Sequence, residues 1–172
     1  MTLIARRSFM VAWPVASVGC AVSAHAMDAL PDARFVGFAQ AVNDFEIASG
    51  NLALARSANE NVRAYATRAI AEHTEAAEEL RKSRQEAGVS YAPDGRMGPN
   101  TANLLARLNS LQGPDFDTAF ASAQLTVQTE AVDQYGAYSQ SGAGGPLRRY
   151  AQRAFPKSKM FLEYAKRLAG GR

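Results

Sequence analysis

The chain of 172 residues is 47% hydrophobic and carries 19 basic and 16 acidic side chains, a formal net charge of +3. The basic residues are interleaved with acidic ones, which argues against nucleic acid as a partner. A single cysteine, Cys20, excludes an internal disulfide framework and an iron–sulfur cluster held by several thiolates.

Residues 1–26 have the pattern of an export signal peptide. Arg6 and Arg7 precede an apolar stretch over residues 9–24, and a small-x-small cleavage site ends at Ala26. At about 15 residues the apolar stretch is too short to span a bilayer. We therefore expect cleavage after Ala26, a periplasmic or otherwise exported protein, and no transmembrane segment in the mature chain.

Two details of this segment leave the export route open. Arg6-Arg7-Ser8-Phe9-Met10 resembles the twin-arginine signal, although an arginine pair also suits the general secretion pathway. Val18-Gly19-Cys20 allows a lipoprotein signal in which Cys20 becomes acylated, but Ser17 stands where such signals usually have a bulky aliphatic residue. Cleavage after Ala26 is the preferred interpretation.

Loss of the signal peptide restricts the chemistry of the mature chain. Cys20, Trp13 and His25 leave with it, so His73 becomes the only histidine, and 17 basic side chains face 16 acidic ones. Residues 27–172 suffice for one domain with a hydrophobic core and are too few for two typical domains. No linker, low-complexity run or clear repeat divides them, so we predict a single domain.

Apolar residues recur three and four positions apart along most of the chain, which predicts helices. The first helix should cover 32–57, with Gly50 as a weak point. Asn59 or Asn61 can cap a second helix that Gly88 ends. Residues 89–99 contain the turn sequence Pro93-Asp94-Gly95 and should form the longest irregular segment.

The sequence of the second half of the chain predicts one short helix and two long helices. The short helix should start at residue 100 or 101 and run through 111, followed by long helices over 116–139 and 146–169. Pro156 should kink the last helix, because proline removes a backbone hydrogen bond. Four long helices with one short extra helix predict an all-α four-helix bundle.

Several short motifs resemble, in order, a bacterial exported family known as domain of unknown function 4142, whose members are often described as outer membrane proteins. The resemblance covers nearly all of the mature chain and implies a ferritin-like helical bundle. The motifs are Phe35-Val36, Glu46-Ile47, Leu52-Ala53, Val62-Arg63 with Ala66, Ile70 and His73, Leu108 to Gly113 before Phe116-Asp117, and Phe155-Pro156.

The resemblance also implies a polar site inside the bundle, built from a glutamate on the first helix and one histidine on each of the other three. Glu46 and His73 match this pattern, but Gln128 and Phe161 stand at the remaining two positions. A glutamine amide is a weak ligand and a phenyl ring is none, which weakens the case for an inherited divalent transition-metal site. A di-iron site is excluded, because Ile70 precedes His73 where that site needs a glutamate.

Three interpretations of these residues remain. In the preferred one, Glu46, His73 and Gln128 hydrogen-bond one another in a polar core, because a lone buried polar group is costly. In the second, Glu46 and His73 bind a metal or a small ligand. An enzyme is the least favoured, since no nucleophile stands beside a base, although a Glu46/His73 acid–base pair is conceivable. Burial should lower the pKa of His73 and a nearby Glu46 carboxylate should raise it, so its direction stays open.

The last helix is rich in arginine and lysine, which suits contact with an anionic surface or an acidic envelope protein. The interleaved apolar positions favour a packed helix with a solvated rim instead. Together these features predict an exported, non-catalytic helical bundle in envelope physiology or stress tolerance, with oligomeric state and partner open. A metal- or ligand-binding bundle is the alternative.

Overall fold

The computed structural model describes residues 29–90 and 99–170, which form five α-helices and no strand. The helices are α1 (Asp32–Arg56), α2 (Glu60–Glu86), α3 (Pro99–Asn109), α4 (Gly113–Ser141) and α5 (Gly145–Ala169). The all-α prediction is confirmed, and the helix bounds agree with the sequence to within a few residues. The predicted signal peptide, 1–26, and the turn at 93–95 lie outside the described residues.

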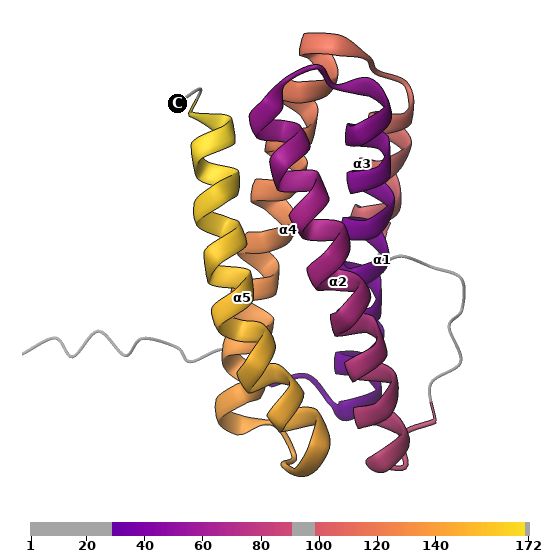
Figure 1. The fold of residues 1–172 in the computed structure, drawn as a ribbon. Coiled ribbons are helices and arrows are strands. Elements are labelled where there is room, and N and C mark those ends of the chain that lie inside the picture. Colours follow the sequence, from indigo (N-terminus) through magenta and orange to yellow (C-terminus); the bar gives the residue numbers. More distant parts are fainter. Residues whose placement is uncertain (1–28, 91–98, 171–172) are drawn as a thin grey trace, which may run out of the picture.

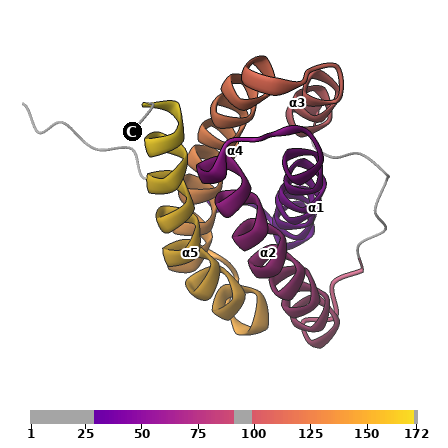
Figure 2. The same cartoon turned by 45° about the horizontal axis from the view of Figure 1, so that its top comes forward.

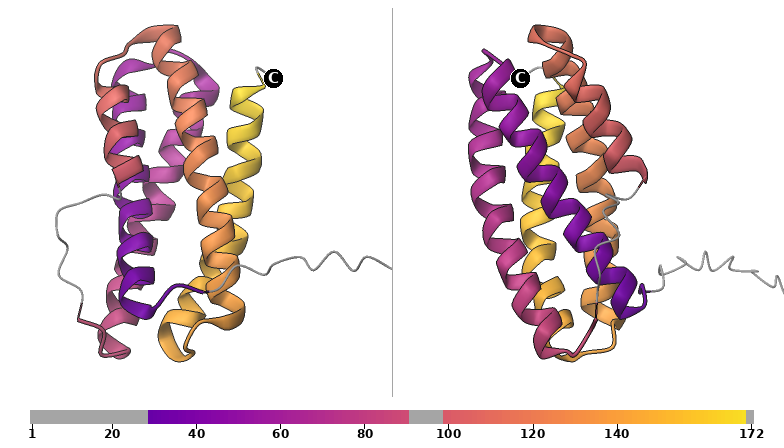
Figure 3. Two further views of the ribbon diagram at one scale, coloured as in Figure 1. Left: turned by 180° about the vertical axis from the view of Figure 1, so that it is seen from behind. Right: turned by 90° about the vertical axis from the view of Figure 1, so that its right-hand side faces the viewer.

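The four long helices surround one core (Figures 1 and 2). Helix α1 packs on α2 and α4, and α5 packs on the same two helices. Helices α2 and α4 therefore occupy opposite corners and run in the same direction. The chain passes from the end of α2 to the start of α4 by a crossover that contains α3, which lies against α1 and α4 (Figure 3). One long crossover is the connection of a ferritin-like bundle.

Local signals explain where the helices start and end. The side chain of Asn59 accepts hydrogen bonds from the backbone N–H groups of Asn61 and Val62 and caps α2. Gly88 adopts φ of 67°, a conformation that favours glycine, directly after α2. Arg56 at the end of α1 donates to the backbone oxygens that end α3, including that of Asn109 at 2.6 Å, and so ties the short helix to the bundle.

Aromatic side chains fill the end of the core where α1 begins and α4 ends. The rings of Phe35 and Tyr138 stack with centroids 3.6 Å apart, and Tyr135 and Tyr150 meet Phe35 edge to face. The hydroxyl of Tyr138 donates to Asp32 at the first turn of α1. These contacts fix the register of the antiparallel α1 and α4 at this end.

Two residues that break helices by propensity lie inside helices here. Helix α5 continues through Pro156, so the proline does not end it, and the kink stays a prediction. Helix α1 continues through Gly50, which is buried against α2. A Cβ at position 50 would lie 2.8 Å from Cγ1 of Ile70 and 3.3 Å from the backbone oxygen of Ala66. Gly50 is therefore a point of close helix approach rather than a weak point of the helix.

None of the described helices combines the length and apolar character that crossing a membrane requires.

We predict that Gly50→Ala destabilises the bundle. Overpacking against Ile70 should cost about 1–3 kcal/mol, which exceeds the gain of about 1 kcal/mol in helix propensity. Urea unfolding measures the difference. In an Ile70→Ala background the added methyl group gains space, so the same substitution should cost less or become stabilising. An equal cost in both backgrounds would contradict the close approach.

Candidate functional site

The carboxyl group of Glu46 lies at the centre of the bundle and is fully buried. Nε2 of Gln128, on α4, donates to Glu46 Oε1 over 3.1 Å. Only one orientation of the Gln124 side-chain amide matches its donor and acceptor atoms to those of the neighbouring residues. Its Nε2 then lies 2.6 Å from Glu46 Oε1 and 3.1 Å from the hydroxyl of Tyr65, and its oxygen accepts from Ser49. Two amides from α4 thus hold the carboxyl of α1.

This environment makes Glu46 a neutral acid at neutral pH. Burial raises the pKa of Glu46 from its usual 4.5 to about 8, and the hydrogen bond from Gln128 offsets only part of that rise. Burial, together with the nearby Glu46, also raises the pKa of the Tyr65 phenol. These side chains are therefore neutral and hydrogen-bonded. We call the set the glutamate layer; it consists of Glu46, Gln124, Gln128, Tyr65 and Ser49.

His73 belongs to a different hydrogen-bonded group. Its Nδ1 lies 2.9 Å from Oδ1 of Asn43, and Nδ2 of Asn43 donates to the hydroxyl of Tyr150 over 3.3 Å. Tyr150 in turn is hydrogen-bonded to Tyr135. In the described part of the chain, no hydrogen bond joins His73 to Glu46 or Gln128. The preferred sequence interpretation is thus right for Glu46 with Gln128 and wrong for His73, whose partner is Asn43.

The imidazole of His73 is neutral at physiological pH. Burial lowers the pKa of His73 from 6.5 to about 4, and the opposing effect of Glu72 is smaller. Nε2 of His73 has no hydrogen-bond partner among residues 29–90 and 99–170. His73 also lines a cavity of about 20 Å³ between α2 and α5, which is room for about one water molecule.

The two positions where the family pattern would place histidine lie next to the two that are kept. Gln128 contacts Glu46, and the ring of Phe161 packs on His73 with centroids 5.4 Å apart. The described residues contain no group of three or more histidine, cysteine, aspartate or glutamate side chains able to hold a metal ion. The donor set of Glu46, His73, Gln128 and Phe161 does not fit a complete transition-metal site.

Asn43 and Gln124 were not among the site residues predicted from the sequence. Asn43 precedes Glu46 by three positions and Gln124 precedes Gln128 by four, so each pair shares one helix face. Helical spacing was therefore the signal that could have found both. It could not show which polar side chain each would meet.

Three of the seven basic side chains of α5 pair with acidic side chains of α2. The ion pairs run antiparallel along the two helices, from Arg149 with Glu86 (3.2 Å) and Arg153 with Glu79 (2.5 Å) to Lys157 with Glu72 (2.8 Å). We call these three pairs the ion-pair row. Part of the charge that suggested an anionic surface or partner is therefore used within the bundle. Contact of this helix with a partner stays a prediction.

The buried acid and the buried histidine should affect stability in opposite directions. Because the pKa of Glu46 is raised from 4.5 to about 8, its contribution is full at low pH and is lost as pH rises toward 8. Because the pKa of His73 is lowered from 6.5 to about 4, the unfolded chain binds the extra proton and stability falls as pH drops below 6.5. Between pH 6.5 and 8 Glu46 alone sets the slope.

We therefore predict that the free energy of unfolding falls by about 1 kcal/mol per pH unit on average across this interval, with a shallower slope as the pH approaches the folded pKa of Glu46. Glu46→Gln, which mimics the neutral acid, should abolish the slope, while the exposed Asp44→Asn on the same helix should keep it. Urea unfolding at pH 6.5 and at pH 8 measures all three proteins. Parallel slopes for Glu46→Gln and the parent would show that Glu46 is ionised in the folded state.

Comparison with known proteins agrees with the helical fold and with the resemblance seen in the sequence. No curated protein and no solved structure shows significant similarity to this chain. A family model described as a domain of unknown function (DUF4142) matches residues 19–168, which include every described helix except the last residue of α5. The chain belongs to the DUF4142 family.

Proposed function

We propose that the protein is an exported, non-catalytic helical bundle of the bacterial cell envelope. Membership of an uncharacterised family assigns no activity, so the proposal depends on the residues themselves. The export part depends on the sequence pattern of residues 1–26.

One observation carries the non-catalytic part of the proposal: the bundle's own side chains enclose the carboxyl group of Glu46 and hydrogen-bond to it. Glu46 is fully buried, neutral and held by two amides. A general acid or base needs access to substrate and a pKa near the working pH. Glu46 has a suitable pKa, but its carboxyl group is sealed from solvent. His73 is buried too, and its pKa of about 4 keeps it neutral.

The glutamate layer instead suits a structural role. A buried polar group that loses its partner costs about 1–3 kcal/mol, so the arrangement in which Gln124 and Gln128 face Glu46 is favoured over other rotations of α4. Buried polar layers can in this way select one packing of similar helices. We infer that Glu46 helps to specify the bundle.

Cell fractionation tests export. The full chain produced in a bacterium with two membranes should appear in the periplasmic fraction with Met27 at its N-terminus, and a variant lacking residues 2–26 should stay in the cytoplasm. Arg6→Lys with Arg7→Lys should block export if the twin-arginine route is used and leave it intact if general secretion is used. An uncleaved full chain in the cytoplasm would refute the proposal.

A second candidate function is binding of a metal or a small ligand at His73. The observation that favours it is the unpartnered Nε2 of His73, together with the cavity that His73 lines. The imidazole of His73 and the carboxyl group of Glu46 belong to separate hydrogen-bonded groups. They make at most a weak site, since tight metal sites use three or four protein ligands. This candidate therefore ranks below the structural role.

Metal content separates the two candidates. The mature protein, purified without a histidine tag and incubated with zinc, iron, copper or manganese salts, should retain no stoichiometric metal by mass spectrometry. Metal that is retained by the parent and lost in both His73→Ala and Glu46→Ala would establish the second candidate. Circular dichroism of the variants checks that they remain folded.

A further inference from the structure

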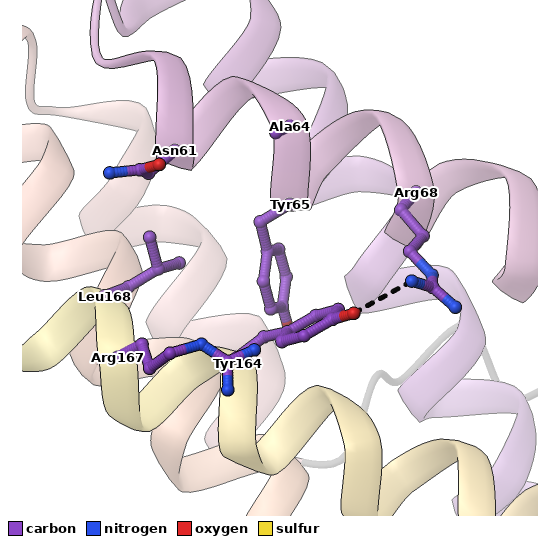
Figure 4. Close-up of a pocket in the computed structure, with 7 residues that line it drawn as sticks. All are labelled: Asn61, Ala64, Tyr65, Arg68, Tyr164, Arg167 and Leu168. Atoms are coloured by element: carbon purple, nitrogen blue, oxygen red, sulfur yellow. Dashed lines mark hydrogen bonds between the residues drawn. The ribbon is translucent and has the colours of Figure 1, made fainter. Parts of the chain in front are cut away.

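A groove opens between the first half of α2 and the end of α5, and Tyr65 of the glutamate layer forms part of its wall (Figure 4). Its volume is about 310 Å³, near the lower limit for small-molecule sites. We call it the arginine groove. It is lined chiefly by Ala64, Tyr65 and Arg68 of α2 and by Tyr164, Arg167 and Leu168 of α5.

The groove lies beyond the end of the ion-pair row. Glu72 and Lys157 form the last pair of that row. One helical turn before Glu72, α2 presents Arg68 rather than another acid, and the partner on α5 is Tyr164, whose hydroxyl accepts from Arg68 over 2.9 Å. The pairing of acidic residues on α2 with basic residues on α5 ends at this point. Arg68 and Arg167 instead both line the arginine groove.

Both guanidinium groups are arranged around the same tyrosine. Arg167 lies over the ring of Tyr164 at 4.4 Å from its centroid, and Arg68 lies at 5.5 Å. Neither forms an ion pair with a carboxylate within residues 29–90 and 99–170. Tyr164 thus contacts both arginines, Arg68 through its hydroxyl and Arg167 through its ring (Figure 4). Glu72 and Glu163 interact with them only at longer range, and guanidinium N–H groups match the geometry of a carboxylate.

The rest of the groove is mainly apolar. The ring of Tyr65 and the side chains of Ala64 and Leu168 line it beside the arginines (Figure 4). A second hollow of about 610 Å³ shares Asn61, Arg167 and Leu168 with the groove and continues toward the start of α4. That hollow also has polar lining residues, among them Asp117 and Ser122. An occupant with an anionic head at the arginines therefore places its apolar body against Tyr65 and Leu168 of the groove itself.

We propose that the arginine groove binds a small amphiphilic carboxylate, with its head group between Arg68 and Arg167 and its apolar body against Tyr65 and Leu168. The ligand supplies the carboxylate that the ion-pair row lacks at this point. The small volume favours a small molecule over a polymer. This inference goes beyond the proposed function and uses neither Glu46 nor His73.

Titration of the mature protein with octanoate, followed by two-dimensional NMR and calorimetry, tests the proposal. We expect saturable binding with a Kd on the order of 1 mM, given the few atoms of this ligand. Shifts should concentrate at residues of α2 and α5 that line the groove. Arg68→Gln and Arg167→Gln should each weaken binding by about tenfold, the effect of losing one charge-assisted contact.

The controls separate this site from general attraction to a positive protein. Lys159→Gln removes one charge from the same helix, at a side chain placed over Phe155 and away from the groove, and should leave octanoate affinity unchanged. Acetate and inorganic phosphate test the charge alone, and octanol tests the apolar body alone. Each should bind at least about tenfold more weakly than octanoate, because each lacks one of the two contacts.

Three outcomes would overturn the proposal. One is equal weakening by Lys159→Gln and the two arginine variants, which would indicate nonspecific charge attraction. Another is phosphate or octanol binding as tightly as octanoate. The third is no saturable shift at the groove in a parent protein whose spectrum shows that it is folded. Arg68 and Arg167 are exposed, so their variants should fold, and thermal unfolding checks this.

Discussion

The buried carboxyl of Glu46 is the constraint on which the arrangement of the bundle depends. It lies where α1 faces α4, and it needs donors that only α4 supplies, from Gln124 and Gln128. Burial keeps it protonated, so the core contains no unpaired charge. A neutral acid surrounded by amides costs far less to bury than a carboxylate, and it still restricts how the two helices can be rotated and shifted.

The polar groups of the molecule divide into a sealed interior and an open end. Glu46 and His73 lie in two separate hydrogen-bonded groups inside the bundle, and within the described residues each group leaves one buried atom without a partner, Oε1 of Gln128 and Nε2 of His73. Outside, acidic α2 and basic α5 neutralise each other along the ion-pair row. Because that row stops at Glu72, the arginine groove contains two arginines that form no ion pair with a carboxylate of the described residues. The ligand site that we propose therefore lies in the arginine groove at the surface, rather than among the polar residues of the core.

The candidate site was predictable only in part. Glu46, His73 and Gln128 stood out because each is polar within an apolar helical stripe, and all three are buried. Spacing could not show that His73 would meet Asn43 instead of Glu46, since that depends on the rotation of α2 against α1. Gly50 was misjudged for a similar reason. Helix propensity describes glycine in an isolated helix. In the bundle, Gly50 allows α1 to pack closely against Ile70 of α2.

The sequence by itself determined the all-α class, the order and approximate bounds of the helices, the cap at Asn59 and the family. These follow from periodicity and from local backbone chemistry, which act over a few residues. Only the tertiary structure decided which buried polar groups pair, where the charges of α5 are neutralised and where Arg68 meets Tyr164. Those outcomes depend on how the helices are rotated and shifted against one another, and residues far apart in the chain set that arrangement together.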